Sequence, residues 1–452
     1  MNRPIHVVGA GLAGTECAWQ LATRGHLVVL WEMRPQTTTP AHRTEHFAEL
    51  VCSNSLRSDD PHHPSGLLKR EMESFGSLVL AAARAEAVPA GSALAVDRER
   101  FARRVGESLE RHPRVEIRRE ERVDLPQGDV VLATGPLTSP ALQSRLAEIL
   151  GAEHLYFYDA ISPVVEAESL DCSRLFAASR YGKGGGDDYL NSPLDRAQYL
   201  AFREALLGAE VLALREFETA LFFEGCLPIE ELARRGEDTL RFGPMKPVGL
   251  RPPDGGRPYA VVQLRQEDLA RSQYSLVGFQ SRLKWPDQRR VLRTIPGLEH
   301  VEFVRLGQVH RNTFVNAPVH LDRLYRVKVL PRLRLAGQIT GVEGYLESAA
   351  TGLAAALYLD LERRGEGRRG SVVEPLPTTT ALGALARHLT ESDPCRFQPA
   401  NVNYGLFPAL PRRLSRGDRR AGLAARAAAD LGAWSAAHGY APTDRVFELR
   451  TG

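Results

Sequence analysis

Short apolar runs separated by glycine-rich turns open the chain. The first run, Ile5–Val8, leads into a stretch with helical periodicity, and a second run, Val28–Trp31, follows and ends at the acidic Glu32. Apolar runs of about four residues bounded by turn signals are typical of buried strands, and the stretch between them is long enough for a helix. This order predicts a β-α-β unit at the start of the chain.

Two later apolar runs follow the same pattern. Val130–Leu132 leads into Ala-Thr-Gly at residues 133–135, and residues 333–336 lead into a glycine-rich turn at 337–344. An Ala-rich segment, residues 348–359, has the composition of a helix that begins after this turn. Three strand-to-turn junctions in this order predict one sheet to which the chain returns twice. All three turns are expected to lie at the same bound cofactor.

The predicted fold class is therefore α/β. We expect an FAD-binding Rossmann-like domain of the glutathione-reductase type, split into residues 1–140 and 332–452, with an inserted α+β domain at 141–331. Strands in the insertion are expected at residues 211–214, 259–264 and 301–306, and a helix at Arg196–Leu207. After a surface connection at 363–377, helices are expected at 381–389 and 419–438.

The turn after the first strand carries Gly9-x-Gly11-x-x-Gly14. In this fingerprint the first glycine permits a tight turn, the second lets the backbone approach a pyrophosphate, and the third lets the helix pack close to the sheet. The pyrophosphate lies at the helix N-terminus, where unpaired N–H groups favour an anion. Glu32, 21 residues after Gly11, is placed to bind a ribose hydroxyl.

The fingerprint alone does not distinguish a nicotinamide from a flavin dinucleotide. The long chain beyond it and the two later turns favour FAD, whose pyrimidine edge would meet the N-terminus of the third helix. The residues expected at the cofactor are Gly9, Ala10, Gly11, Leu12, Ala13, Gly14, Glu32, Arg34, Thr134, Gly135, Gly337, Gln338, Gly341, Glu343 and Gly344.

Composition narrows the class of protein. Hydrophobic residues make up 43% and charged residues 25% of the 452 residues, which is ordinary for a globular enzyme. No apolar run approaches the ~18 residues of a membrane span, and the sequence enters its first strand without room for a signal peptide. We therefore expect a cytoplasmic protein without a membrane partner. The net charge of +3 does not by itself indicate nucleic-acid binding.

Five cysteines are scattered along the chain without a CxxC motif, which argues against a disulfide framework and against a metal site. Burial in the core is the expectation for Cys17, Cys172 and Cys395. Cys226 precedes Leu-Pro and a helix-like segment at 229–235, so it would lie at a helix N-terminus, where the dipole favours a thiolate. Cys52 is expected in a polar loop after a helix.

Segments spread over nearly the whole chain carry a resemblance to a known family. They are residues 9–14, 32–35, 50–57, 157–163, 179–184, 223–230, 241–249, 337–345 and 401–405. The chain resembles the folate- and FAD-dependent tRNA (uracil-54-C5)-methyltransferases, and the segments around Cys52 and Cys226 are the most diagnostic. Residues 337–345 are shared with a larger flavoprotein that modifies wobble uridines. Ser192 departs from the family, in which many relatives carry cysteine, so a thiol there cannot be essential.

The resemblance implies methylation of carbon-5 of uracil in the tRNA T loop, with 5,10-methylenetetrahydrofolate as carbon donor, FAD as cofactor and NADPH or NADH as reductant. It makes Cys226 the candidate thiolate that adds to carbon-6, and Cys52 the second candidate thiol; the two roles stay interchangeable. Tyr345 is a candidate to stack on the folate ring or to pack against the flavin. The expected tRNA contacts are Lys246, Arg282 and Lys284.

Three alternatives remain open at this point. The first is a wobble-uridine-modifying flavoprotein, which would act with a partner protein on the anticodon, whereas no obligate protein partner is expected for the methyltransferase. The second is a general FAD oxidoreductase that reduces a small molecule without RNA. The third is a flavin-bound RNA-binding protein without catalysis, whose function Cys226→Ala would leave intact. The choice between NADPH and NADH and the oligomeric state are not predicted.

Overall fold

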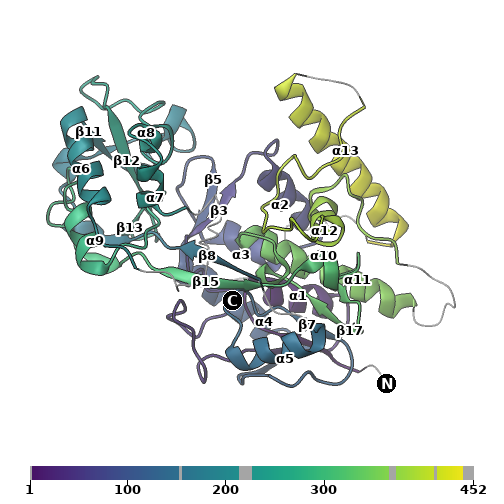
Figure 1. Cartoon of the computed structure of the whole chain (residues 1–452). Helices are drawn as coiled ribbons and strands as arrows, with labels where there is room; N and C mark the ends of the chain where they lie inside the picture. The colour runs from purple at the N-terminus through teal and green to yellow at the C-terminus, as the bar shows by residue number, and fades with distance from the viewer. Residues whose placement is uncertain (1–2, 152–154, 213–226, 366–372, 412–414, 441–452) are drawn as a thin grey trace.

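The computed structural model describes residues 3–151, 155–212, 227–365, 373–411 and 415–440 (Figure 1). Cys226 and the second half of the strand expected at 211–214 lie outside the described residues. Figure 1 shows a larger part that contains the first and the last described elements, and a smaller part, at the left, joined to it by a long two-stranded ribbon.

The larger part is built on a six-stranded sheet that draws on distant regions of the chain. Across the sheet the strands are β16 (Arg326–Val327), β17 (Leu330–Leu335), β7 (Val130–Leu132), β1 (Ile5–Val8), β2 (Val28–Trp31) and β6 (Val115–Arg118). Neighbours are parallel except for β16 and β17. β2 and β7 are buried along their whole length, as expected for parallel strands covered by helices on both faces.

Two helices cross this sheet side by side, α1 (Leu12–Thr23) and α11 (Tyr345–Gly365). Glycines permit their close approach. A Cβ atom at Gly14 would stand 1.8 Å from the carbonyl oxygen of Gly9, and one at Gly352 would stand 2.1 Å from the carbonyl oxygen of Ala13. The pair therefore fixes the first helix of the chain against a helix that begins more than 300 residues later.

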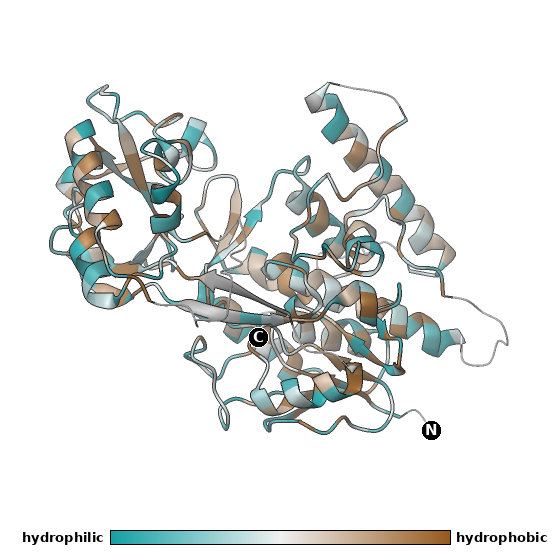
Figure 2. Ribbon diagram, viewed as in Figure 1, coloured by the Kyte–Doolittle hydropathy of each residue, from teal (hydrophilic) through white to brown (hydrophobic). Residues whose placement is uncertain are grey.

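The other elements of the larger part surround this core. They are the small sheet β3 (Ser55–Ser58), β5 (Ala93–Val96) and β4 (Ala87–Val88), and the helices α2 (Pro64–Ser74), α3 (Leu78–Ala85), α4 (Arg98–Glu110), α5 (Pro140–Leu150), α10 (Ala317–His320), α12 (Ala381–Glu391) and α13 (Arg416–Ala437), with the 3₁₀ turn η5 (Gln338–Thr340). Figure 2 shows apolar segments gathered among the helices around the first sheet, where one large core cluster lies.

The smaller part has its own antiparallel sheet and its own core. Across the sheet the strands are β10 (Phe176–Ala177), β11 (Tyr189–Leu194), β12 (Ala260–Gln266), β13 (Gln273–Leu276), β9 (Val164–Glu166) and β14 (Phe303–Arg305). The helices are α6 (Arg196–Leu207), α7 (Ile229–Arg234), α8 (Thr239–Phe242) and α9 (Trp285–Leu292), with 3₁₀ turns η1 (Ala167–Ser169), η2 (Cys172–Arg174) and η3 (Arg180–Gly182). The ribbon of β8 (Leu155–Ala160) and β15 (Val309–Phe314) joins it to the larger part (Figure 1).

This architecture confirms the α/β fold class with an inserted α+β domain; the domain boundaries at 140 and 331 stay predictions. The helix expected at 348–359 is confirmed but longer, because it begins at Tyr345 and continues to Gly365. Other local expectations were wrong. No helix precedes Cys52, because the Glu49 carboxylate accepts hydrogen bonds from the amides of Arg43 (2.8 Å) and Thr44 (3.1 Å) and closes a turn instead.

The cysteines also differ from expectation. Cys17 is buried in α1 as predicted, whereas Cys172 and Cys395 are exposed, each in a short turn closed by the carboxylate of Asp171 or Asp393. The strand expected from residue 211 is reduced, in the described residues, to a single bridge between Val211 and Leu283. None of the helices in the described ranges is long and apolar enough to cross a membrane.

Candidate functional site

A cavity that is open to solvent on one side lies where the strands of the first sheet end. Its walls come from the residues that directly follow β1, β2, β7 and β17. All four are carboxyl ends of parallel strands, the edge at which open α/β sheets bind their ligands. Of the expected cofactor residues, the lining includes Gly9, Ala10, Gly11, Leu12, Ala13, Glu32, Arg34, Thr134, Gly135, Gly337 and Gln338.

The glycines after β1 leave room for a pyrophosphate at the N-terminus of α1. Gly9 has a φ of +98°, and a Cβ atom there would stand 2.6 Å from the carbonyl oxygen of Ala133. Gly11 is different, because a Cβ atom there would meet nothing within 4 Å. A side chain at Gly11 would therefore fill open space rather than disturb the fold. This cradle fits the pyrophosphate of a dinucleotide.

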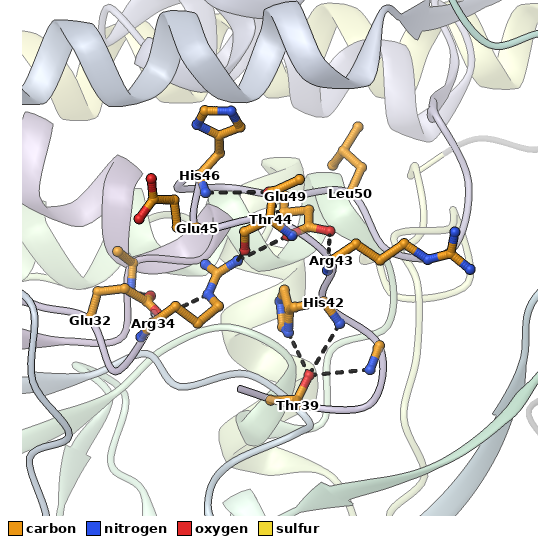
Figure 3. Close-up of polar contacts among 12 residues, drawn as sticks. Glu32, Arg34, Thr39, His42, Arg43, Thr44, Glu45, His46, Glu49 and Leu50 are labelled. Carbon is orange, nitrogen blue, oxygen red and sulfur yellow. Dashed lines mark hydrogen bonds and ion pairs between the residues drawn. The ribbon is translucent and has the colours of Figure 1, made fainter. Parts of the chain in front are cut away.

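Glu32 and Arg34 form a buried ion pair at the edge of this cavity (Figure 3). One Glu32 oxygen accepts from the amide of Ala10 (3.0 Å), and the other accepts from Nε of Arg34 (2.8 Å). Burial alone would raise the pKa of Glu32, but the hydrogen bonds and charge of Arg34 outweigh it and lower the pKa below its usual value. The ionised carboxylate has further lone pairs with which to accept a ribose hydroxyl.

Arg34 is held on its other side by Glu49 and the loop before Cys52. Its Nη1 donates to Oε2 of Glu49 (3.1 Å) and to the carbonyl oxygen of Thr44 (3.2 Å), as Figure 3 shows. Arg34 is 2% exposed. The side chain expected at the cofactor thus also fixes residues 44–49 against the cavity.

Four expected cofactor residues, Gly14, Gly341, Glu343 and Gly344, do not line the cavity. Gly341 has a φ of +92° and packs against Phe397, and Gly344 has a φ of +108° directly before α11. The Glu343 carboxylate accepts from Nε2 of Gln338 (2.6 Å). These residues shape the turn that presents Gly337 and Gln338. Gly14 acts in the same indirect way, through the close packing of α1.

The Cys52 loop, residues 50–54, borders the cavity, whose lining includes Val51. Two arginines from different parts of the molecule hold three successive carbonyl groups of this loop. Arg98 donates to the carbonyl oxygens of Leu50 (2.7 Å) and Cys52 (3.3 Å), and Arg305 donates to those of Val51 (2.8 Å) and Cys52 (3.1 Å). The loop is therefore fixed jointly by α4 and by the inserted domain.

The amide side of the loop is held by Tyr345, which also lines the cavity. Its hydroxyl oxygen accepts from the amides of Cys52 (2.5 Å) and Ser53 (3.3 Å). Burial, reinforced by Cys52, raises the pKa of Tyr345, which keeps the phenol neutral. The hydroxyl of Tyr345 thus anchors the Cys52 loop. Stacking of its ring on a folate stays a prediction.

Positive side chains outnumber negative ones around the Cys52 loop. Nε of Arg98 donates to Glu267 (2.5 Å), and this carboxylate raises the pKa of Arg98 although burial opposes it. Burial and the neighbouring Arg98 lower the pKa of Arg305 to about 10. One carboxylate faces two guanidinium groups, so positive charge remains beside Cys52, whose Sγ lies 3.9 Å from the carbonyl oxygen of Ala160.

Sequence reasoning missed Arg98, Glu267 and Arg305. The sequence gives a weak indication of a role for Arg98. A cation at the first position of a helix is unfavourable with the helix dipole, which suggests that its side chain has another partner. Arg305 carried none, since its partners lie more than 250 residues away. The candidate nucleophile Cys226 lies outside the described residues.

The expected tRNA contacts differ in their surroundings. Arg282 forms ion pairs with Glu230 and Glu231 and is largely buried, and Lys284 pairs with Glu210 (2.5 Å). Lys246 engages no carboxylate among the described residues. Within the same ranges, no three His, Cys, Asp or Glu side chains are grouped so that they could hold a metal ion.

Comparison with known proteins agrees with this geometry. The family model described as glucose inhibited division protein A matches residues 4–367. The structure is similar to that of Aquifex aeolicus GidA in two crystal forms, with TM-scores of 0.68 and 0.66 at 17% and 16% identity, over 98% and 95% of this chain. This chain covers 77% and 73% of those chains. At such identity the likeness concerns the fold, which is the FAD-binding Rossmann-like class.

Curated relatives are far more similar in sequence. The protein named methylenetetrahydrofolate–tRNA-(uracil-5-)-methyltransferase TrmFO from Geobacter sulfurreducens is 54% identical over 440 residues, which are 96% of this chain and 100% of the relative. The protein of the same name from Moorella thermoacetica is 55% identical over 94% of this chain and 97% of its own length. The chain belongs to the GidA family, and its full-length relatives place it in the methylenetetrahydrofolate–tRNA-(uracil-5-)-methyltransferase (TrmFO) family.

Proposed function

We propose that this protein methylates carbon-5 of uracil-54 in the T loop of tRNA. The methylene carbon would come from 5,10-methylenetetrahydrofolate, and NADPH or NADH would be the reductant. The observation that carries the proposal is the position of Cys52: its loop borders the dinucleotide cavity and is held there by Arg98, Arg305 and Tyr345. The near-full-length relatives named for this reaction support it.

The cavity residues fit FAD. The glycines at 9 and 11 would cradle its pyrophosphate, Glu32 would accept a ribose hydroxyl, and Gly337 and Gln338 would meet its ring system near the N-terminus of α11. When bound and reduced, FAD supplies the hydride that converts carbon at the formaldehyde level into a methyl group.

The protein's own thiols would activate the base. Carbon-5 of uracil is a poor nucleophile, and a thiolate that adds to carbon-6 moves electron density onto carbon-5. Carbon-5 can then attack the one-carbon unit, whose bonds to the folate nitrogens break so that tetrahydrofolate leaves. The proton on carbon-5 must leave before the thiol departs. We assign the attack to Cys226 on resemblance, and to Cys52 the second role, as acid/base or protecting thiol.

The tRNA would bind across the inserted domain, with its phosphates near Lys246, Arg282 and Lys284. Lys246 is the most available of the three, whereas Arg282 and Lys284 would have to exchange their carboxylate partners. The target base must leave the stack of the folded tRNA to reach a thiol beside the cofactor cavity.

The decisive experiment is methyl incorporation into unmodified tRNA, with purified protein, NADPH and isotopically labelled methylenetetrahydrofolate. We expect label at the T-loop uracil and none when labelled S-adenosylmethionine replaces the folate. Cys226→Ala should abolish incorporation while FAD content is retained. Parallel reactions with NADPH and NADH compare the two reductants.

The alternatives give different results in the same assay. Modification of the anticodon would support the wobble-uridine flavoprotein, and NADPH oxidation with a small acceptor but without RNA would support a general oxidoreductase. tRNA binding without label, in wild type and Cys226→Ala alike, would support a non-catalytic RNA-binding protein. Any of these outcomes would contradict the proposed methylation.

A further inference from the structure

The inserted domain exposes a group of apolar side chains, which we call the Tyr181 patch: Tyr181, Phe242 and Val248 with the basic residues Lys183 and Lys246. Tyr181 is 64% exposed, Phe242 80% and Val248 55%. The segments that carry Tyr181 and Val248 meet, because the amide of Tyr181 donates to the carbonyl oxygen of Gly249 (2.8 Å), and Phe242 precedes Val248 by six residues. A Cβ atom at Gly249 would stand 2.9 Å from the Tyr181 ring. Exposed apolar side chains that gather in one place, rather than singly, mark a surface that binds a partner.

The basic residues of the Tyr181 patch are not neutralised. In the part of the chain that the structure describes, neither Lys183 nor Lys246 engages a carboxylate, and the nearby Arg251 is exposed and likewise unengaged. Other cations of the same domain are paired, among them Lys284 with Glu210 and Arg174 with Glu299. Unpaired cations beside exposed rings are the combination that binds single-stranded nucleic acid, by phosphate contacts and base stacking.

The backbone under the Tyr181 patch is held in a defined shape. Tyr181 has a φ of +57°, a left-handed conformation that is costly for a residue with a side chain. Arg180 fixes it by donating to the carbonyl oxygen of Val248 (2.8 Å) and to Oε1 of Gln263 (2.9 Å). The Asp188 carboxylate accepts from the amide of Gly91 (2.6 Å), which ties the following loop to the larger part of the molecule. The exposed ring is therefore presented on a rigid support.

Strand β12 connects the backbone under the Tyr181 patch to the Cys52 loop. Gln263 and Arg265 lie two residues apart on β12, so they share a face of the sheet, about 7 Å apart. Gln263 holds Arg180, and Nη2 of Arg265 donates to Oγ of Ser53 (3.3 Å), the neighbour of Cys52. A nucleic acid on the Tyr181 patch would thus lie on the face that reaches the thiol. A base turned out of a folded RNA leaves neighbours without stacking partners, which an exposed ring can replace.

We infer that the Tyr181 patch is the surface on which the tRNA docks, with the Tyr181 ring stacked on an unpaired base and Lys183 and Lys246 on the flanking phosphates. The inference rests on the proposed function for the identity of the RNA. It deepens that function by assigning a stacking residue to the RNA site.

The test is direct binding of unmodified tRNA to the full-length, FAD-loaded protein, without folate or reductant. Tyr181→Ala should weaken binding by about 10-fold or more, and Tyr181→Phe should retain it, because stacking needs only the ring. Val329→Ala is the control, since Val329 is 68% exposed but lies in the larger part, away from the residues placed at the tRNA. Its affinity should equal that of wild type.

The basic residues give a second measurement that does not depend on the tyrosine variant folding. Lys246→Ala should reduce the slope of log affinity against log salt by about 1, whereas Lys328→Ala, an exposed lysine of the larger part, should not. Equal affinities of wild type and Tyr181→Ala with FAD bound, or an equal loss in Val329→Ala, would overturn the inference, and so would an unchanged salt slope in Lys246→Ala.

Measuring both tRNA binding and methyl transfer distinguishes failure of the docking surface from failure of the proposed function. If tRNA binds through the patch but no methyl group is transferred, the proposed function fails and the docking surface stands. If the enzyme methylates tRNA but Tyr181→Ala leaves both affinity and kcat/KM unchanged, the docking surface fails and the proposed function stands.

Discussion

The dinucleotide cavity and the Cys52 loop meet at Val51 and Tyr345, yet they are built in opposite ways. The cavity is formed by residues that directly follow four strands, with backbone groups and glycines as its main components. The Cys52 loop is held by side chains that lie 48, 254 and 293 positions away in the chain. A cofactor is thus held by local motifs, and a reactive side chain by long-range contacts.

The difference predicts how each region fails. Damage to the cavity should remove FAD, whereas damage to the contacts of the loop should leave FAD in place and misplace the thiol. Because Arg305 belongs to the inserted domain, that domain can influence Cys52 without touching the cofactor.

The largest effect is expected from the glycine fingerprint. Gly14→Ala would place a Cβ atom 1.8 Å from the carbonyl oxygen of Gly9, so α1 must move; we expect loss of bound FAD and a stability lower by about 3 kcal/mol. Gly11→Ala is the matched variant, because its Cβ atom enters open space. It should fold normally and still bind FAD weakly. Flavin absorbance and thermal melting measure both; FAD content like that of wild type in Gly11→Ala would refute the cradle.

Arg305→Met is the next strongest test, because it leaves the carbonyl group of Val51 without a donor and that of Cys52 with Arg98 alone, while the cavity stays intact. A displacement of the thiol by about 1 Å should lower kcat about 100-fold, with FAD content unchanged. Arg305→Lys keeps the charge and should recover part of the rate. Steady-state methylation kinetics decide; a variant that loses FAD in proportion to activity would break the distinction between the two regions.

Tyr345→Phe separates the two roles of the tyrosine that borders both regions. The ring is kept and the acceptor for the Cys52 and Ser53 amides is lost, which should lower stability by about 1–3 kcal/mol and reduce kcat less than Arg305→Met does. The KM for methylenetetrahydrofolate should stay unchanged if the ring stacks on the folate. A changed KM with an unchanged kcat would contradict anchoring of the loop by the hydroxyl.

The smallest effect concerns a long-range contact far from the thiol. Glu71 on α2 accepts from the amides of Ala381 and Leu382 at the start of α12, and burial raises its pKa to about 8. Its protonated form is favoured in the fold, so its contribution to stability is complete below pH about 4.5 and is lost as the pH rises through about 8. Glu71→Gln should flatten this slope in chemical denaturation without changing kcat. A slope unchanged by the substitution would refute the assignment.

The contrast between local motifs and long-range contacts also explains which parts of the fold and of the site could be predicted from the sequence. The first β-α-β unit and the turns after β7 and β17 were predicted because their glycines lie within a few residues of the strands and helices that they connect. The helix Arg196–Leu207 was predicted to the residue, since Asp195 and Gln198 form a capping box that is visible in the sequence. Arg305 and Glu267 were missed because nothing near them in the sequence indicates a partner.

The exposed Cys172 and Cys395 show a related limit. Thiols are buried more often than not, so burial was the expectation, but short turns around Asp171 and Asp393 override that average. Tyr181, likewise, had no local signal for its left-handed conformation, which depends on contacts with residues 248 and 249.

The packing of α11 on α1 also has a consequence for the order of folding during synthesis. The ribosome has released the first strands and α1 long before it makes Gly352, the residue that lets α11 rest on Ala13. At about 5–20 residues per second, the wait is on the order of half a minute. During that interval β7 lacks its neighbour β17 and the cavity lacks one wall. The cavity is therefore complete only after residue 348 has been made, so we expect the cofactor to bind late in the synthesis of each chain.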